Sequence, residues 1–174
     1  MKKFSLLLFV FIISSVAIFA QEVHEMENMR VSINAIESKN TRSIETTKNN
    51  GKDYIAGKSS CYNKNGQAKG GKLLWPYAEY AIESKLSGGD YIITVFYKID
   101  SKNAPSDAKI LVGMDLLEAE ELAVEKKLLN NSVKATFSPK LLKGKNHTLK
   151  IWLPSKGVEI DRFEVRRALI KKKD

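Results

Sequence analysis

Apolar and polar residues alternate along several short segments of the chain, as expected for β-strands that bury one face. In residues 147–153 one face carries three aliphatic side chains, and the other carries Thr148, Lys150 and Trp152. The same period of two predicts strands over residues 29–35, 77–86 and 132–138. The pattern therefore indicates a chain built from short β-strands.

Residues 91–98, YIITVFYK, are almost all β-branched or aromatic, so both faces of this segment are apolar. Such a composition predicts a central strand of a sandwich. We expect Ile92, Thr94 and Phe96 to face the core. A second short apolar strand is expected over residues 110–114, with a bulge at its glycine, Gly113.

Two stretches give weaker signals. Residues 36–53 are polar and end in an Asn-Asn-Gly turn, and we expect the segment that follows, up to Lys72, to be a long loop. Residues 116–129 have a helix-like composition, but their apolar positions form no stripe. We interpret them as a loop followed by a strand near residues 121–127.

Short strands separated by Gly, Asn, Ser and Pro turns at roughly ten-residue spacing predict an all-β fold, an antiparallel sandwich or barrel. The sequence contains no internal repeat and no regular alternation of strands with helices. A sandwich core needs inward-facing residues from both of its sheets. We expect the aliphatic face of residues 147–153, together with Phe163 and Val165, to supply part of it.

The first residues predict export. Lys2 and Lys3 precede an almost wholly apolar run over residues 4–19, which ends at Ala20. This arrangement is typical of a cleaved secretory signal peptide, and the run is shorter than the roughly 20 residues that span a membrane. We therefore expect a periplasmic, cell-surface or secreted protein with no membrane span after cleavage. The expected organisation is a signal peptide over residues 1–20, one sandwich domain over 21–170 and a basic tail over 171–174.

The formal net charge is +9 at pH 7, and the basic residues are spread along the chain apart from a cluster at the C-terminus. A basic balance suits acidic polysaccharide, an anionic envelope surface or nucleic acid. The sequence has no nucleic-acid-binding motif, so we do not expect nucleic acid as a partner. Cys61 is the only cysteine, which excludes an internal disulfide, so packing must hold the fold.

The sequence lacks the motifs of common enzyme classes. His24 and His147, the two histidines, form no recognisable framework with Cys61 or with a serine and an acid. There is no Gly-rich phosphate loop and no metal-type His/Cys spacing. The acidic residues do not form a recognisable pair for glycoside hydrolysis. We therefore expect no catalytic activity.

Two longer segments carry a resemblance to a known family. AEYAIESKLSGGDYIITVFYKID resembles the central hairpin of carbohydrate-binding modules of families 6 and 35, and LLKGKNHTLKIWLPSKGVEIDRFEVRR resembles their closing hairpin. The resemblance covers about residues 77–167, in the same order. It implies an antiparallel jelly-roll β-sandwich of the galactose-binding-domain-like type.

The resemblance also implies a ligand site. In that family an aromatic side chain stacks on the sugar, polar groups bind its hydroxyls, and loops at one end of the sandwich often carry the cleft. Trp75 and Tyr77 are therefore the first candidates, with Tyr62 and Asn63 in the preceding loop. Trp75 has a second interpretation as a plug at the end of the core. Trp152 is either a second platform on a sheet face or a residue covered by the N-terminal segment.

Asp161 has two interpretations. In the family, an acidic residue at this place helps to hold a structural calcium or accepts backbone hydrogen bonds at the edge of a sheet. Calcium binds six to eight oxygens, and Glu22, Glu25 and Glu27 do not match the partner acid that the family places on its first strand. Both interpretations stay open, and the edge contact is the preferred one.

Taken with the predicted export, the resemblance implies a non-catalytic module that binds an oligo- or polysaccharide, alone or beside a glycan-degrading enzyme or an envelope protein. The alternative is an envelope structural or adhesion protein that uses the sandwich to bind a protein. Exposed Trp75 and Tyr77 would favour the first, and a flat apolar patch or an exposed strand edge the second. The sequence does not identify the sugar.

Overall fold

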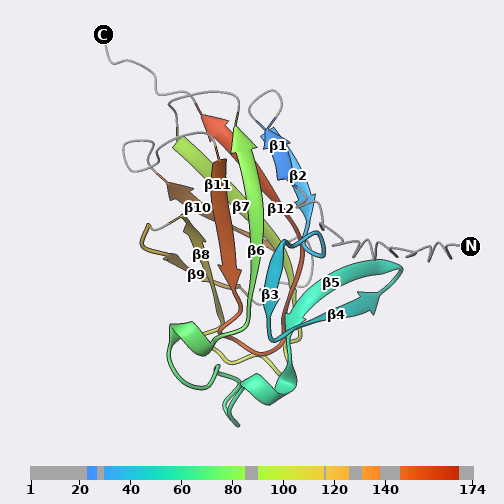
Figure 1. The fold of residues 1–174 in the computed structure, drawn as a ribbon. Coiled ribbons are helices and arrows are strands. Elements are labelled where there is room, and N and C mark those ends of the chain that lie inside the picture. Colours follow the sequence, from blue (N-terminus) through green and yellow to red (C-terminus); the bar gives the residue numbers. More distant parts are fainter. Residues whose placement is uncertain are drawn as a thin grey trace, which may run out of the picture.

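The chain folds into two β-sheets that face each other in a computed structural model (Figure 1). The structure describes residues 23–26, 30–84, 90–115, 117–125, 131–137 and 146–168. The strands predicted from alternation in the first, central and closing parts of the chain are all present. The predicted all-β sandwich is therefore confirmed.

The first sheet, sheet A, has the order β1-β6-β11-β8-β9, and β3 also pairs with β6. Its strands are β1 (Val23–Met26), β3 (Asn40–Arg42), β6 (Tyr77–Ser84), β8 (Lys109–Met114), β9 (Glu120–Ala123) and β11 (Asn146–Trp152). The pair β1–β6 is parallel, and the other pairs of this sheet are antiparallel. The long strands β6 and β11 lie next to each other at its centre.

The second sheet, sheet B, has the order β10-β7-β12-β5-β4, and β2 also pairs with β12. Its strands are β2 (Arg30–Asn34), β4 (Ile44–Asn49), β5 (Lys52–Gly57), β7 (Asp90–Ile99), β10 (Asn131–Phe137) and β12 (Val158–Ala168). All of its pairs are antiparallel. The register between β7 and β12 shifts between Ile160 and Arg162, which marks a bulge at Asp161.

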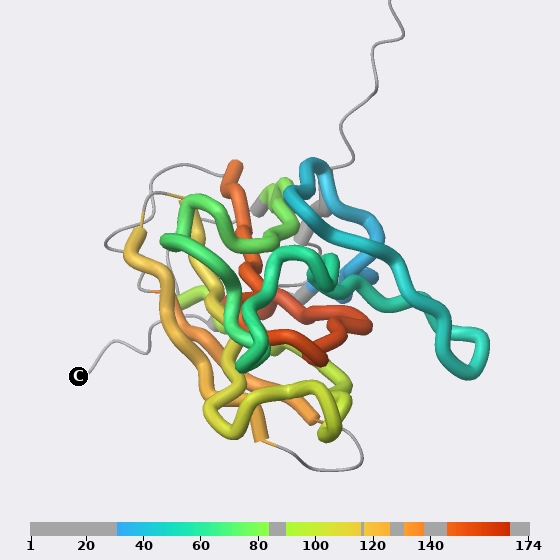
Figure 2. Tube along the Cα trace, turned by 90° about the horizontal axis from the view of Figure 1, so that it is seen from below, coloured from blue at the N-terminus to red at the C-terminus, as the bar shows by residue number. Residues whose placement is uncertain are grey.

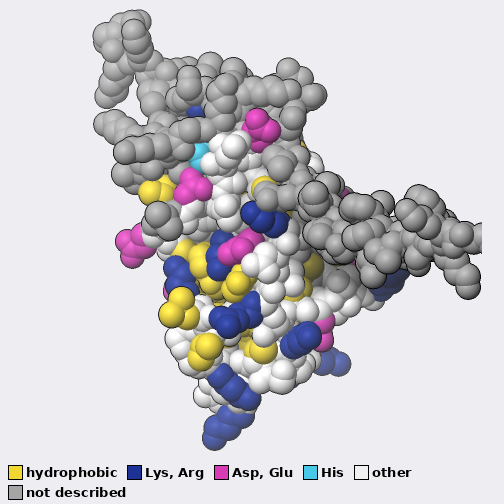
Figure 3. Space-filling model, viewed as in Figure 1, with side chains coloured by type: hydrophobic (Ala, Val, Ile, Leu, Met, Phe, Trp, Pro, Cys, Tyr) yellow, Lys and Arg dark blue, Asp and Glu magenta, His cyan; other side chains and the backbone are white. Residues whose placement is uncertain are grey.

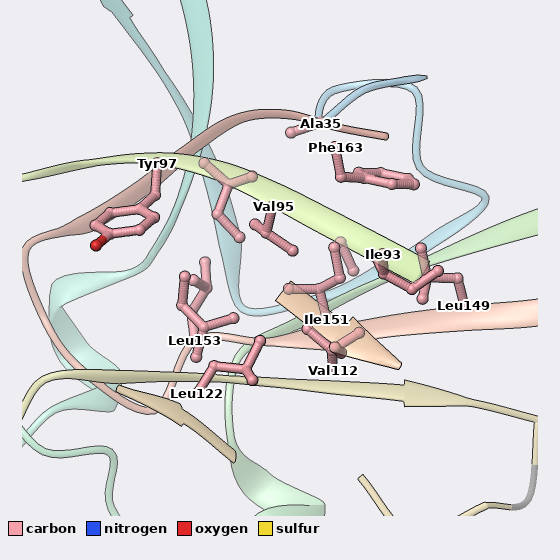
Figure 4. Packing of buried hydrophobic residues seen from close by; sticks show 14 of the residues in the cluster. Ala35, Ile93, Val95, Tyr97, Val112, Leu122, Leu149, Ile151, Leu153 and Phe163 are labelled. Carbon is pink, nitrogen blue, oxygen red and sulfur yellow. The ribbon is translucent and has the colours of Figure 1, made fainter. Parts of the chain in front are cut away.

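The core lies between the sheets and is supplied by alternate residues of facing strands (Figure 4). From sheet A come Leu149 and Ile151, and Leu153 follows β11; all three are fully buried, as predicted. Phe163 and Val165 face them from β12 and are also fully buried. Each such side chain contributes roughly 1.5–3 kcal/mol by leaving water, so this interior stabilises the fold without a disulfide.

The inward face of β7 differs from the prediction. Tyr91, Ile93, Val95 and Tyr97 are buried, whereas the expected set of Ile92, Thr94 and Phe96 is only half-buried and faces outward. Because both faces of this strand are apolar, its composition does not select a face. The choice is made by tertiary pairing, since β7 lies between β10 and β12 and follows their alternation.

Three further expectations need correction. The region expected to be polar loop contains β3, β4 and β5, and 3-10 turns over Ser59–Cys61 and Lys72–Leu74 interrupt the rest. Gly113 forms no bulge, because the register of β8 with β11 runs through it without a shift. The strand expected near residues 121–127 is the shorter β9.

Strands β4 and β5 form a hairpin that reaches away from the body of the sandwich (Figure 2). Asn50 and Gly51 at its turn both have positive φ, 50° and 77°, as the Asn-Gly turn signal predicts. Beyond the root of the hairpin β5 pairs only with β4, because its pairing with β12 involves just Ile55 and Ala56. Much of the hairpin is therefore a two-stranded ribbon.

Buried hydroxyl and imidazole groups connect strands across the interior. The Tyr80 hydroxyl donates to the Ala35 carbonyl at 2.7 Å, and the Tyr80 ring meets Phe163 edge-on with centroids 4.5 Å apart. Burial raises the pKa of Tyr80, so this hydroxyl stays a donor. The buried His147 bridges Tyr91 and Asp115, with its Nε2 3.1 Å from the tyrosine oxygen and its Nδ1 2.8 Å from a carboxylate oxygen. These contacts fix strands of one sheet to the other.

The predicted signal peptide and basic tail lie outside the described residues. Within the described segments, the structure contains no helix with the length and apolar character that crossing a membrane requires.

The orientation of β7 can be tested with adjacent residues. Ile93→Ala should lower the free energy of unfolding by about 2–5 kcal/mol, because it opens a cavity at a fully buried position. Ile92→Ala removes the same atoms from the outward face and should cost roughly 1 kcal/mol or less. Urea denaturation of the purified variants measures both values. Equal losses, or a larger loss at Ile92, would contradict the observed orientation.

Candidate functional site

Two predicted site residues meet on the outer face of sheet A. Tyr77 is the first residue of β6 and Trp152 is the last residue of β11, and the antiparallel register makes them direct cross-strand partners. Their chain neighbours Ala78 and Ile151 point into the core and are fully buried. The two aromatic side chains therefore face outward together, half-buried in the surface.

This pair is the middle of a longer row. The register places Arg42 of β3 beside Tyr77, Leu111 of β8 beside Trp152, and Glu121 of β9 beside Leu111. Neighbours of this kind have Cβ atoms about 4.5–5.5 Å apart. We call Arg42, Tyr77, Trp152, Leu111 and Glu121 the aromatic row. It crosses five strands and has three apolar side chains at its centre.

A second row, the polar row, lies on the same face, two residues away along each strand. It consists of Asn40, Glu79, Lys150 and Gly113. The Lys150 ammonium lies 2.8 Å from Glu79 Oε1, and the Asn40 amide donates to Glu79 Oε2 at 3.1 Å. Figure 3 shows this face of the molecule, where hydrophobic side chains lie among basic and acidic ones over β6 and β11.

Lys150 also couples the two rows. Its Nζ lies 3.4 Å from the centroid of the Tyr77 ring and 5.2 Å from that of Trp152. Cations in these positions are attracted to the electron-rich faces of aromatic rings. The ammonium is therefore held by a carboxylate and two rings at once, which fixes both the lysine and the aromatic side chains.

The electrostatics of Glu79 reflect these contacts. Partial burial acts to raise its pKa, but hydrogen bonds from Lys150 and Asn40 and the nearby positive charges outweigh it and hold the pKa below the ordinary value of 4.5. Glu79 is therefore a stable carboxylate at neutral pH and accepts hydrogen bonds rather than donating them.

Gly113 makes room for the indole of Trp152. A Cβ at this position would lie 3.0 Å from Cζ3 and 3.2 Å from Cη2 of the ring. A side chain there would push the ring away from the sheet. Gly113 thus has a packing role and does not form the predicted bulge. It lets the edge of the indole lie close against β8.

The segment before β6 borders the aromatic row. Lys72 places its Nζ 4.5 Å from the centroid of Trp152, and Arg42 donates to the Leu73 carbonyl. Leu73 and Leu74 are 86% and 60% exposed, so this border has an apolar edge as well as a basic one. These contacts place residues 70–75 beside the aromatic row rather than in a separate cleft.

Trp75 is half-buried at the end of this border. Its indole N–H donates to the Gly70 carbonyl at 3.1 Å, which closes the segment on itself. Its polar group is thus used within the loop. The platform and plug interpretations of Trp75 both stay predictions.

Tyr62 and Asn63 have roles within the loop. Tyr62 is only 6% exposed, and its hydroxyl donates to the Leu153 carbonyl at 2.9 Å. Burial raises its pKa. Gly57 leaves the space for this ring, because a Cβ there would lie 1.9 Å from the hydroxyl oxygen. Asn63 is exposed, and its carboxamide oxygen accepts the backbone N–H groups of two later loop residues. We place neither residue in the two rows.

Asp161 lies on the other sheet, in an open pocket that it shares with residues of β2 and β5. Its carboxylate is 2.8 Å from Arg162 and 3.7 Å from Lys52, and its carbonyl accepts the Ala35 N–H at 2.9 Å. Two cations beside the carboxylate compete with calcium, and no cluster of three potential metal-binding side chains occurs among the described residues. The Asp161 carboxylate is thus engaged by side-chain cations, and only its backbone carbonyl accepts a backbone N–H. The calcium and edge-contact interpretations of Asp161 both stay predictions.

The chain resembles several solved structures in fold. It is similar to the C-terminal CBM6 of LamC, a marine laminarinase from Zobellia galactanivorans (14% identity, TM-score 0.56, covering 79% of this chain and 99% of that one). A CBM6 from the Cellvibrio mixtus lichenase 5A, solved with cellotriose, matches at 13% identity and a TM-score of 0.53, covering 79% and 97%. A family 35 carbohydrate-binding module from Clostridium thermocellum matches at 12% and 0.50, covering 80% and 98%.

Other similar structures include larger enzymes, among them a β-mannanase chain from Podospora anserina. No family model matches the chain, and no curated protein matches its sequence. At these identities the likeness establishes the fold alone. The antiparallel jelly-roll β-sandwich of carbohydrate-binding modules of families 6 and 35 is therefore confirmed as the architecture of this chain.

The pKa of Glu79 gives a pH test. Because its folded pKa is lowered, the stability that it contributes is present above its ordinary value of 4.5 and is lost as the pH falls through the folded value. The difference in free energy of unfolding between wild type and Glu79→Gln should be constant near neutral pH and shrink below about pH 4.5. The difference should stay under roughly 1 kcal/mol, because the pair is partly exposed.

Denaturation at a series of pH values measures this difference. As a control, the same comparison in a Lys150→Met background should depend less on pH. A difference that grows as the pH falls would contradict the assignment.

Proposed function

We propose that this chain is an exported, non-catalytic module that binds a glycan on the outer face of sheet A. The observation that carries the proposal is the cross-strand pair of Tyr77 and Trp152, flanked by the polar row. A pyranose has an apolar C–H face and a rim of hydroxyls. The pair offers aromatic surface to the first, and Asn40, Glu79 and Lys150 offer hydrogen-bonding groups to the second.

The shape of the face suits an extended ligand. The aromatic row runs across five strands of a sheet, so one sugar unit over Trp152 leaves room for a neighbour over Tyr77. The contacts that fix Lys150 and Glu79 hold their polar groups in place before a ligand arrives. Such preorganisation lowers the entropy lost on binding.

The similarity to carbohydrate-binding modules supports the proposal, because one of these modules was solved with cellotriose and another belongs to a laminarinase. That second case also supports a partner role, in which the module assists a glycan-degrading enzyme.

Non-catalytic action is supported by the carboxylates of the face. A glycosidase needs one carboxylic acid with a raised pKa to protonate the leaving group. Glu79 has a lowered pKa, and Glu121 lies 2.9 Å from the ammonium of Lys109. The proposed role of both residues is to bind and position.

Binding can be tested with a glycan array and matched variants. Trp152→Ala and Tyr77→Ala should each weaken binding by roughly tenfold or more, the scale of a central contact residue, and leave the fold intact because both side chains face outward. Phe96→Ala is the control, since it removes a half-buried aromatic ring from the outer face of sheet B and should not change binding. Trp75→Ala tests the bordering segment, residues 70–75, separately from the aromatic row.

Specific binding that survives both substitutions would move the site elsewhere. An array without any hit, with folded protein confirmed by circular dichroism, would reject glycan binding and direct attention to protein partners.

Export has its own test. If the predicted signal peptide is removed after Ala20, the protein recovered from its native compartment should begin at Gln21. N-terminal sequencing or intact mass measurement reads this directly. A chain that keeps its first 20 residues would contradict the proposal.

A further inference from the structure

Positive charge exceeds negative charge around the two rows. Five cationic side chains and two carboxylates lie on or beside them: Lys39, Arg42, Lys72, Lys109, Lys150, Glu79 and Glu121. Three of the cations are engaged by oxygen atoms, since Lys150 pairs with Glu79, Lys109 pairs with Glu121, and Arg42 donates to a backbone carbonyl. Lys72 has no such contact with an oxygen atom among the residues that the structure describes.

Lys72 occupies the position where a sugar would stack. Its ammonium lies over Trp152, 4.5 Å from the ring centroid, and among the described residues no carboxylate forms an ion pair with it. The residue is exposed and sits in the 3-10 turn beside the platform. A flexible lysine at the surface gains only a weak attraction from an aromatic ring, so it can be exchanged for a ligand.

The exchange distinguishes neutral from acidic ligands. A neutral sugar that stacks on Trp152 displaces the ammonium and offers it only uncharged hydroxyl acceptors. A sugar with a carboxylate or sulfate forms an ion pair with the displaced ammonium, in which both the donor and the acceptor of the hydrogen bond carry charge. The surplus of positive charge on this face attracts the same ligands from a distance.

We propose that the ligand of this face is an acidic glycan, and that Lys72 binds the anionic group of the unit stacked on Trp152 or of its neighbour. The inference rests on the proposed glycan binding and adds the chemical class of the ligand. Lys150 and Glu79 are already paired with each other, so they bind hydroxyls, and Lys72 supplies the selectivity for charge.

Matched pairs of polysaccharides test this inference. Polygalacturonate is compared with its carboxyl-reduced form, and a sulfated galactan with its desulfated form, by isothermal titration calorimetry. Each pair keeps the sugar backbone and changes the charge, and the two pairs separate carboxylate from sulfate. The wild-type protein should bind at least one charged form roughly tenfold more tightly than its neutral partner.

Two variants locate the effect. Lys72→Gln should lose most of the preference for the charged form and keep the affinity for the neutral form. Lys134→Gln is the control, because Lys134 is also an exposed lysine and lies on the outer face of β10 in the opposite sheet. It should leave both affinities unchanged, which excludes a general effect of net charge.

The outcomes separate this inference from the proposed function. Equal binding of charged and neutral forms, or a preference that Lys72→Gln leaves intact, overturns the inference and keeps glycan binding. Failure of every polysaccharide to bind, charged or neutral, counts against glycan binding itself.

Discussion

The register between β6 and β11 is the constraint on which both the core and the candidate site depend. Leu149 lies opposite Tyr80, and Ile151 lies opposite Ala78, all fully buried. The intervening positions therefore face outward and include the pair of Tyr77 and Trp152. A slip of one residue would turn the aliphatic face to water and the aromatic pair into the core. Burial of the interior thus positions the outer surface.

Polar groups inside the sandwich add directionality to this packing. Tyr80, Tyr62 and His147 are all buried, and each forms a hydrogen bond that joins segments far apart in the sequence. An unpaired buried hydroxyl or imidazole costs free energy, so other arrangements of the strands would leave these groups unsatisfied. They favour one packing of the two sheets over others in a chain that has a single cysteine.

Much of the fold could be predicted because a half-buried strand has a clear period of two. That signal located β2, β6, β10 and β11, and the family resemblance in the two hairpins pointed to the correct sandwich. Prediction from this signal failed where the alternation of apolar and polar residues is absent. In β7 both faces are apolar, so Ile92 and Ile93 look equivalent in sequence. In β4 and β5 much of the ribbon lies away from the body, so little of it is buried and no alternation marks it.

The candidate site was predictable in its residue types but not in its arrangement. Tyr77 and Trp152 stand out as aromatic residues at strand ends, yet 74 positions separate them along the chain. Their pairing depends on register, which a single sequence does not report. Lys72 and Lys150 look like ordinary surface lysines in sequence. Their significance comes from the rings beneath them, which only the folded chain reveals.

The hairpin of β4 and β5 has a consequence for how the molecule can change. Its outer part belongs to sheet B, lacks the support of a second layer and meets the sandwich at the contact of Lys52 with Asp161, so its local stability is lower than that of the sandwich. The two rows lie on the opposite sheet. Insertions, deletions or substitutions at the Asn50–Gly51 turn therefore leave the aromatic face unaffected. The hairpin is a natural place for a label, a tether or a second binding specificity.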